Sequence, residues 1–96
     1  MTITKNQDGD KLTVALEGRL DTSTSPQLEA ELRASVNGVK ELTFDLEKLD
    51  YVSSAGLRVL LAAQKVMNRQ GEMKIKNVKP EIMEIFESTN ASFSSV

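Results

Sequence analysis

Segments with the two-residue periodicity of β-strands alternate along this chain with segments of helical periodicity. The strand patterns run from residue 3 to a turn at residues 8–10, then over residues 12–17, 41–46 (followed by a short run at 51–52) and 73–78. The helical patterns cover residues 25–36, residues 55–70 and a segment that opens at residue 80. Strands separated by helices need crossover connections, which make neighbouring strands parallel. The order ββαβαβα therefore predicts a single α/β domain with a mixed, mostly parallel sheet, an N-terminal hairpin and helices packed on it.

Residues that start and stop helices flank each helical pattern. Pro26 follows a run of capping residues, Gly71 closes the second helix, and Pro80 opens the third. The second helix has one broad apolar side that we expect to be buried, made of Leu57, Leu60, Leu61, Ala63 and Met67. The third helix is expected to bury its own apolar residues Ile82, Ile85 and Phe86. The methionines expected to fill the core or its edge are Met67, Met73 and Met83.

The composition excludes most catalytic and metal-binding templates. The sequence contains no Cys and no His, which removes Cys/His zinc sites, thiol nucleophiles and histidine-based triads. Three acidic residues could suggest a site for a cation: Asp45, Glu47 and Asp50. The sequence specifies no further ligands for such a cation, so neither a metal nor a cofactor is expected. Because no set of side chains fills the usual catalytic roles, we expect that this protein is not an enzyme.

The length and the charge of the chain further limit the kinds of protein it can be. The 96 residues provide one core, so we expect one domain over residues 1–96, with residues 90–96 as a short or disordered tail. The net charge of −2 argues against direct binding of nucleic acid. The longest purely apolar run, residues 59–63, is too short for membrane insertion, and the amino terminus lacks the apolar core of a signal peptide. We therefore expect a cytoplasmic protein.

Basic side chains gather in one part of the chain. Residues 51–79 contain six basic residues and one acidic residue. Three of them, Arg58, Lys65 and Arg69, fall within about 40° of one another around the second helix. This stripe is either a solvated face or, at Arg58, a contact with an acidic partner surface.

Small and hydroxyl residues occupy the junction between the strand run at 51–52 and the second helix. The first N–H groups of a helix are unpaired, and the positive end of its dipole favours an anion. Ser53 and Ser54 lie at this junction. One serine can simply cap the helix, one can be a modification or ligand site, and both roles can coexist.

Four segments in a fixed order carry a resemblance to a known family. They are residues 16–21, 42–46, 51–61 and 78–82, which read LEGRLD, LTFDL, YVSSAGLRVLL and VKPEI. With these segments, nearly the whole chain resembles the STAS domains, typified by bacterial anti-sigma factor antagonists. The resemblance implies the STAS fold and the role of such an antagonist.

The resemblance also implies a switch controlled by phosphorylation. In that family, the serine two residues before the Gly-Leu pair is phosphorylated by an anti-sigma factor that is also a kinase, and here that position is Ser54. The unmodified protein would capture the anti-sigma factor and free the sigma factor, and a serine phosphatase would reverse the modification. Many phosphorylated members carry Asp before the target serine, where this chain has Ser53, and Asn90 stands where relatives often have Gly.

The residues expected to meet the partner lie in two loops and the first turn of the second helix: Asp21, Thr22, Ser53, Ser54, Ala55, Gly56 and Arg58. Asp21 has a second interpretation, as a helix cap. The alternative to the switch is a nonphosphorylated STAS scaffold, a subunit of a lipid-transport or stress-signalling complex that docks its partner permanently through the same face.

Overall fold

A five-stranded sheet forms the centre of the fold in the computed structural model, which describes residues 1–96. Its strands, in order across the sheet, are β1 (Thr2–Asp8), β2 (Lys11–Leu20), β3 (Glu41–Val52), β4 (Glu72–Lys76) and β5 (Ser94–Ser95). β1 pairs antiparallel with β2, and all later pairs are parallel. The structure thus confirms the mixed, mostly parallel sheet and its N-terminal hairpin.

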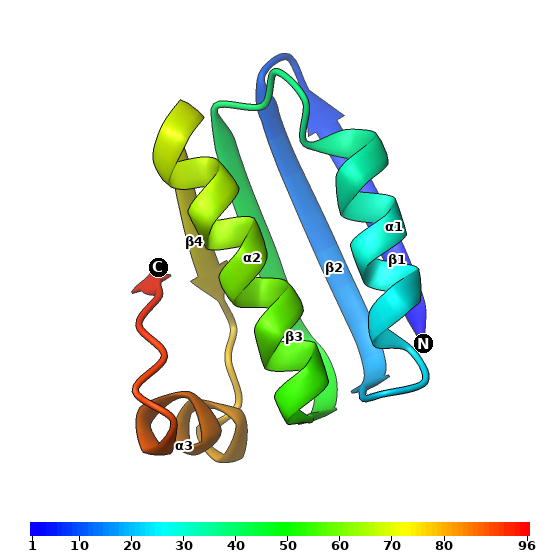
Figure 1. The fold of residues 1–96 in the computed structure, drawn as a ribbon, viewed down its shortest axis with the longest axis vertical. Coiled ribbons are helices and arrows are strands. Elements are labelled where there is room, and N and C mark those ends of the chain that lie inside the picture. The colour runs from blue at the N-terminus through cyan, green and yellow to red at the C-terminus, as the bar shows by residue number, and fades with distance from the viewer.

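Three helices complete the domain: α1 (Ser25–Ser35), α2 (Ser54–Gln70) and α3 (Pro80–Ser88). α1 and α2 lie side by side on one face of the sheet, and α3 lies near one end of it (Figure 1). Parallel strands need these helical crossovers, and the crossovers bring α1 and α2 to the same face. No helix combines the length and the hydropathy that a membrane-spanning segment needs.

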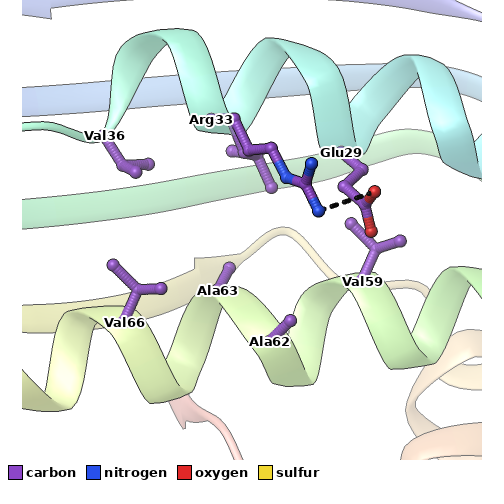
Figure 2. Close-up of a pocket in the computed structure, with 8 residues that line it drawn as sticks. Glu29, Arg33, Val36, Val59, Ala62, Ala63 and Val66 are labelled. Atoms are coloured by element: carbon purple, nitrogen blue, oxygen red, sulfur yellow. Dashed lines mark ion pairs between the residues drawn. The ribbon is translucent and has the colours of Figure 1, made fainter.

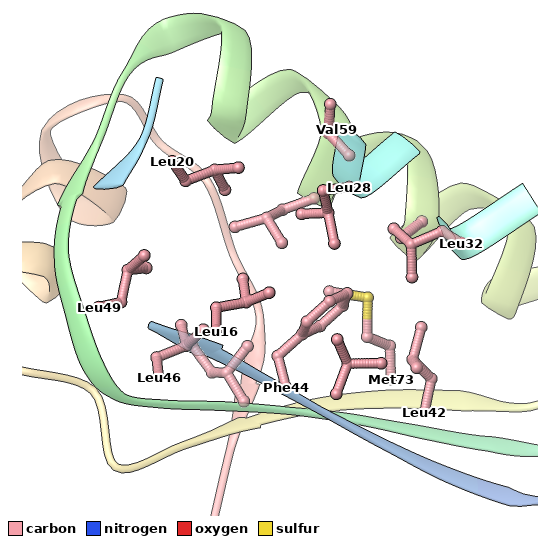
Figure 3. Packing of buried hydrophobic residues seen from close by; sticks show 14 of the residues in the cluster. Leu16, Leu20, Leu28, Leu32, Leu42, Phe44, Leu46, Leu49, Val59 and Met73 are labelled. Carbon is pink, nitrogen blue, oxygen red and sulfur yellow. The ribbon is translucent and has the colours of Figure 1, made fainter. Parts of the chain in front are cut away.

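The core fills the space between the sheet and the two helices. It is one cluster of 21 buried apolar residues. Figure 3 shows Leu16 and Phe44 of the sheet with Leu28 of α1 and Val59 of α2. Met67 and Met73 are fully buried and Met83 is half-buried, as expected for residues that fill the core and its edge.

β3 is longer than the strand pattern predicted. It continues without a break from Glu41 to Val52, whereas the sequence indicated a strand over residues 41–46 and a separate run at 51–52. Its pairing with β2 has two register shifts, between Ala15 and Glu17 and between Gly18 and Arg19. Such irregularities change the side-chain alternation. In the second half of β3, two exposed residues stand between successive buried residues, so the two-residue period is lost.

The prediction for one residue of the second helix is wrong. Leu61 was expected in the buried stripe, but its side chain is 37% exposed. The buried side of α2 is centred on Leu60 and Met67, which are both fully covered. Leu61 follows Leu60 by one residue, a rotation of about 100°, which takes it out to solvent.

The carboxyl-terminal segment packs against the domain in this structure. Asn90, with φ of +58°, follows the end of α3 in the left-handed conformation that Asn tolerates at this position. The Phe93 ring then meets the Phe86 ring edge-on, with 5.1 Å between centroids. Ser94 and Ser95 pair with β4 as β5, which adds one element to the predicted order of a chain expected to end in a tail.

Candidate functional site

The candidate site lies where two neighbouring parallel strands end. Leu20 and Val52, the last residues of β2 and β3, are partners in the sheet. The Ser53 N–H donates to the Leu20 carbonyl oxygen at 2.8 Å, which ties the junction after β3 to the end of β2. The loop that begins at Asp21 and the amino end of α2 are therefore brought together by the sheet itself.

Ser53 is the cap of helix α2. Its backbone is extended, and its Oγ accepts a hydrogen bond from the Gly56 N–H at 3.2 Å. Its carbonyl oxygen accepts the first helical bond, from the Leu57 N–H at 2.8 Å. Of the two interpretations of the serine pair, capping thus belongs to Ser53.

Ser54 occupies the first position of the helix and is exposed. No acidic side chain lies in the first turn of α2. Ser54 thus lies at the positive end of the helix dipole, beside N–H groups that lack a capping partner, and the turn itself supplies no carboxylate to offset them. An anion attached to this hydroxyl would be stabilised by the helix.

Asp21 organises the loop between β2 and α1. Its Oδ1 accepts hydrogen bonds from the Ser23 hydroxyl at 2.8 Å, the Ser23 N–H at 3.0 Å and the Thr24 N–H at 3.1 Å. These donors, the Ser23 hydroxyl first, lower the pKa of Asp21, and partial burial opposes them. Its carbonyl oxygen also accepts from the Ser25 hydroxyl at 2.5 Å. Asp21 therefore holds together the turn at residues 22–24 that leads into α1, but it is not the cap of α1, because the N-cap position of that helix is Thr24.

A hollow of about 380 Å³ lies between the amino ends of α1 and α2. Three predicted site residues line it: Thr22 from the loop, and Ala55 and Arg58 from α2. Thr22 and Arg58 are exposed, and Ala55 is half-buried. Asp21, Ser53 and Gly56 do not line it: Gly56 is buried, and Asp21 and Ser53 are half-buried. They support this surface by their contacts within the loop and the first turn of α2. The structure thus brings the predicted residues to one end of the sheet, and divides them into exposed and supporting sets.

Sequence reasoning missed a cation stacked on an aromatic ring beside the loop. The Arg19 guanidinium lies 4.2 Å from the centroid of the Tyr51 ring, and its Nε lies 3.7 Å from Asp21 Oδ2. Arg19 and Tyr51 are direct partners across β2 and β3 only after the second register shift. No alternation pattern reveals that shift, so the sequence carried no signal for the pair.

Two of the three acidic residues considered for a cation site, Asp45 and Asp50, are engaged by other side chains. Asp45 Oδ1 accepts a hydrogen bond from Asn77 Nδ2 at 3.1 Å, and Asp50 Oδ1 accepts one from Lys79 Nζ at 2.7 Å. This bond to Asp50 raises the pKa of Lys79. No group of three or more carboxylates with the arrangement of a metal site is present in the structure.

These features define a small α/β domain whose candidate site is built from a helix amino terminus and an adjoining loop. The chain belongs to the STAS domain family: the family model described as "Mlab, STAS domain" matches residues 3–92. The anti-sigma factor antagonists expected from the sequence are among its relatives.

Two curated relatives carry that description in their names. The putative anti-sigma factor antagonist BtrV of Bordetella bronchiseptica is 42% identical over 89 residues, which cover 91% of this chain and 77% of the relative. The anti-sigma-B factor antagonist of Listeria monocytogenes is 32% identical over 92 residues, or 92% of this chain and 79% of the relative. In both comparisons, the alignment therefore covers most of this chain and most of the relative.

Solved structures support the same fold. The anti-sigma factor antagonist SpoIIAA in its unphosphorylated form superposes with a TM-score of 0.81 at 16% identity, over 99% of this chain and 87% of that one. An anti-sigma factor antagonist of Mycobacterium paratuberculosis gives a TM-score of 0.87 at 22% identity, over 98% and 83% of the two chains. These similarities confirm the predicted STAS-like fold.

Proposed function

We propose that this protein is an anti-sigma factor antagonist that works as a partner switch controlled by phosphorylation of Ser54. The unphosphorylated form binds an anti-sigma factor with serine kinase activity, and the sigma factor is released. Phosphorylation at Ser54 ends this binding, and a serine phosphatase restores it. The protein acts by binding, as a kinase substrate rather than as an enzyme, in the cytoplasm.

The observation that carries the proposal is the division of roles between the two serines. Ser53 uses its Oγ to cap α2, whereas Ser54 is exposed in the first turn. A kinase can therefore modify Ser54 without removing the cap from the helix. A hydroxyl that held the helix together would be a poor target, because phosphorylation would compete with folding.

The chemistry of a phosphoserine at this position favours a switch of binding rather than of fold. A phosphoserine brings about −1.5 to −2 charge at neutral pH. The amino end of α2 stabilises that charge while it stays in water. An interface that covers Ser54 would have to strip water from the phosphate, which is costly without new partners. The same group is thus tolerated by the free domain and unfavourable in the complex.

The relatives give independent support. Curated relatives are named as antagonists of an anti-sigma factor, and SpoIIAA, which shares the fold, has been solved in both an unphosphorylated and a phosphorylated form. We assign the partner contact to the surface around the hollow between the helices, with its exposed residues Thr22, Ser54 and Arg58, the half-buried Ala55, and the supporting residues Asp21, Ser53 and Gly56.

The proposal is tested by locating phosphate on the protein. The purified chain is incubated with ATP and the purified anti-sigma factor from the same organism, and the product is mapped by mass spectrometry. Phosphate is expected on Ser54, and Ser54→Ala should abolish labelling. Ser53→Ala is the matched control, and it should still be labelled.

Two results would count against this proposal. Labelling that survives Ser54→Ala but disappears in Ser53→Ala would move the switch to the neighbouring hydroxyl. A stable complex with the anti-sigma factor and no phosphate on either serine would favour the nonphosphorylated scaffold.

A further inference from the structure

A second hollow lies beside the first one, in the groove between α1 and α2. It has a volume of about 240 Å³, and six of the eight residues that line it are apolar. On one side lie Leu32 of α1 and Val36, the C-cap residue that follows α1, and on the other side lie Val59, Ala63 and Val66 of α2 (Figure 2). Val66 is 39% exposed although it is a large apolar residue. The groove therefore presents apolar side chains to solvent between two helices.

The two hollows form one continuous groove. Glu29, Val59 and Ala62 line both of them. One end of the groove is the candidate site, at Thr22 and Ala55, and the other end lies more than two helical turns further along α2. From Ala55 to Val66 the helix rises about 16 Å at 1.5 Å per residue. A partner segment of about three helical turns would match this length.

A row of unpaired cations follows the α2 side of the groove. Arg58, Lys65 and Arg69 lie in one row with the groove residue Ala62, at spacings of four, three and four residues. All three are exposed, and none makes an ion pair within the chain. α2 contains no acidic residue to balance them.

The α1 side of the groove is electrostatically neutral. Arg33 Nη2 lies 3.3 Å from Glu29 Oε1, an ion pair drawn in Figure 2. These two charges satisfy each other across one turn of α1. The groove thus has an apolar floor and a neutral α1 wall. On the α2 side Arg58 lines the groove, and Lys65 and Arg69 continue the same basic row just outside the two hollows.

From this arrangement we infer that the groove between α1 and α2 binds an acidic amphipathic helix of the partner. Apolar side chains of that helix would lie against Val36, Val59 and Val66, and carboxylates along its flank would face Lys65 and Arg69. The helix-in-groove mode uses such a pairing of apolar anchors with charged flanks. Only the identity of the partner, the anti-sigma factor, rests on the proposed function.

A synthetic peptide tests the groove without a kinase. The probe is a peptide of about 14 residues, enough for this groove at 1.5 Å per residue, with leucines on one face and glutamates on both flanks. Titration into the isotope-labelled chain, followed by NMR, is expected to shift the methyl signals of Val36, Val59 and Val66. A peptide with glutamine in place of glutamate should bind at least about tenfold more weakly at low salt, because it lacks the charges that face the basic row.

Two matched variants place the binding on the groove. Val66→Glu should weaken binding of the peptide by about tenfold or more. The substitution puts a carboxylate into an apolar contact, next to the glutamates on the flanks of the peptide. Leu61→Glu is the control: Leu61 is on the same helix and is 37% exposed, against 39% for Val66, but it lines neither hollow. The affinity of Leu61→Glu for the peptide should lie within about twofold of the wild-type affinity, since a surface charge outside the contact has little effect. Thermal melting checks that both variants are folded.

Several outcomes would overturn the inference. Equal losses in Val66→Glu and Leu61→Glu, chemical shifts confined to another face, or equal binding of the glutamate and glutamine peptides would each do so. Binding to vesicles of pure phosphatidylglycerol, with no binding to the peptide, would instead identify the face as a lipid contact. The assay involves no phosphate on Ser54, so its result and the labelling result on Ser54 stand or fall separately.

Discussion

Gly56 packs so closely against Leu20 that no side chain fits between them. A Cβ atom at position 56 would lie 2.6 Å from Leu20 Cγ and 2.7 Å from the Leu20 carbonyl oxygen. That carbonyl already accepts the Ser53 N–H. The close approach therefore fixes the first turn of α2 against the end of β2, which is where the two halves of the candidate site meet.

Gly56→Ala is expected to destabilise the domain. Alanine is favoured over glycine inside a helix by about 1 kcal/mol. The added methyl would press on a backbone carbonyl, which no rotamer change relieves, and such overpacking costs about 1–3 kcal/mol. We expect the clash to win, with a net loss of stability in urea denaturation and a displaced amino end of α2. Unchanged stability would mean that the Leu20 segment moves aside freely.

Ser53→Ala and Ser54→Ala should differ in stability. Loss of an N-cap side chain costs about 1 kcal/mol, and Ser53 is the residue whose Oγ accepts the Gly56 N–H. Ser54 is exposed, so its replacement should change the free energy of unfolding by no more than about 0.5 kcal/mol. Paired denaturation curves measure both. A larger loss for Ser54→Ala would contradict the division of roles between the two serines.

Asp21 should make stability depend on pH in the acid range. Its pKa is lowered in the folded protein, chiefly by the Ser23 hydroxyl. A lowered folded pKa means that the stabilisation is present above the unfolded pKa and is lost as the pH falls through the folded pKa. Wild type should therefore exceed Asp21→Asn in stability at neutral pH, and the difference should shrink in acid. If the difference in stability between wild type and Asp21→Asn stays constant with pH, the stabilisation comes from the geometry of the side chain and not from its charge.

Ser54→Asp should weaken binding to the anti-sigma factor while the domain stays folded. The carboxylate places a negative charge at the helix amino terminus, where it is stabilised in the free protein, but an interface that covers it must remove its water. Calorimetry compares Ser54→Asp with Ser54→Ala, and circular dichroism checks the fold. The account fails if the two variants bind equally tightly or if Ser54→Asp has melted.

Most of the fold was predictable because the local signals agree with one another. Pro26, Gly71 and Pro80 mark helix ends where the structure has them, and α1 and α3 begin at or next to the expected residues. The predictions that differ from the structure concern segments where pairing between strands overrides the local sequence pattern. The register shifts between β2 and β3 changed the periodicity of β3, and no local rule shows how the sheet edge would pair with Ser94 and Ser95.

The candidate site was predictable in position but not in its division of labour. The junction of strand and helix pointed to Ser53 and Ser54 together. Only the hydrogen bond from Gly56 shows which of them is the cap. The basic stripe was visible as a helical spacing, but the groove next to it depends on how α1 packs beside α2, which no one-dimensional pattern contains.

Arg58 is exposed and lines the hollow at the candidate site. If Arg58 meets an acidic surface of the anti-sigma factor, Arg58→Glu should slow association several-fold at about 0.05 M salt, because charges at the rim of an interface act chiefly on the encounter rate. The effect should shrink at about 0.5 M salt, where the Debye length is roughly 4 Å.

Lys40→Glu supplies the matched control for this experiment. Lys40 is also exposed and makes no ion pair, but it comes just before β3, at the opposite end of that strand from Ser53. It changes the net charge by the same amount and lies away from the contact. A larger loss in Arg58→Glu than in Lys40→Glu would place Arg58 in the interface. Equal losses would show that only the total charge of the protein matters, and Arg58 would then belong to a solvated face.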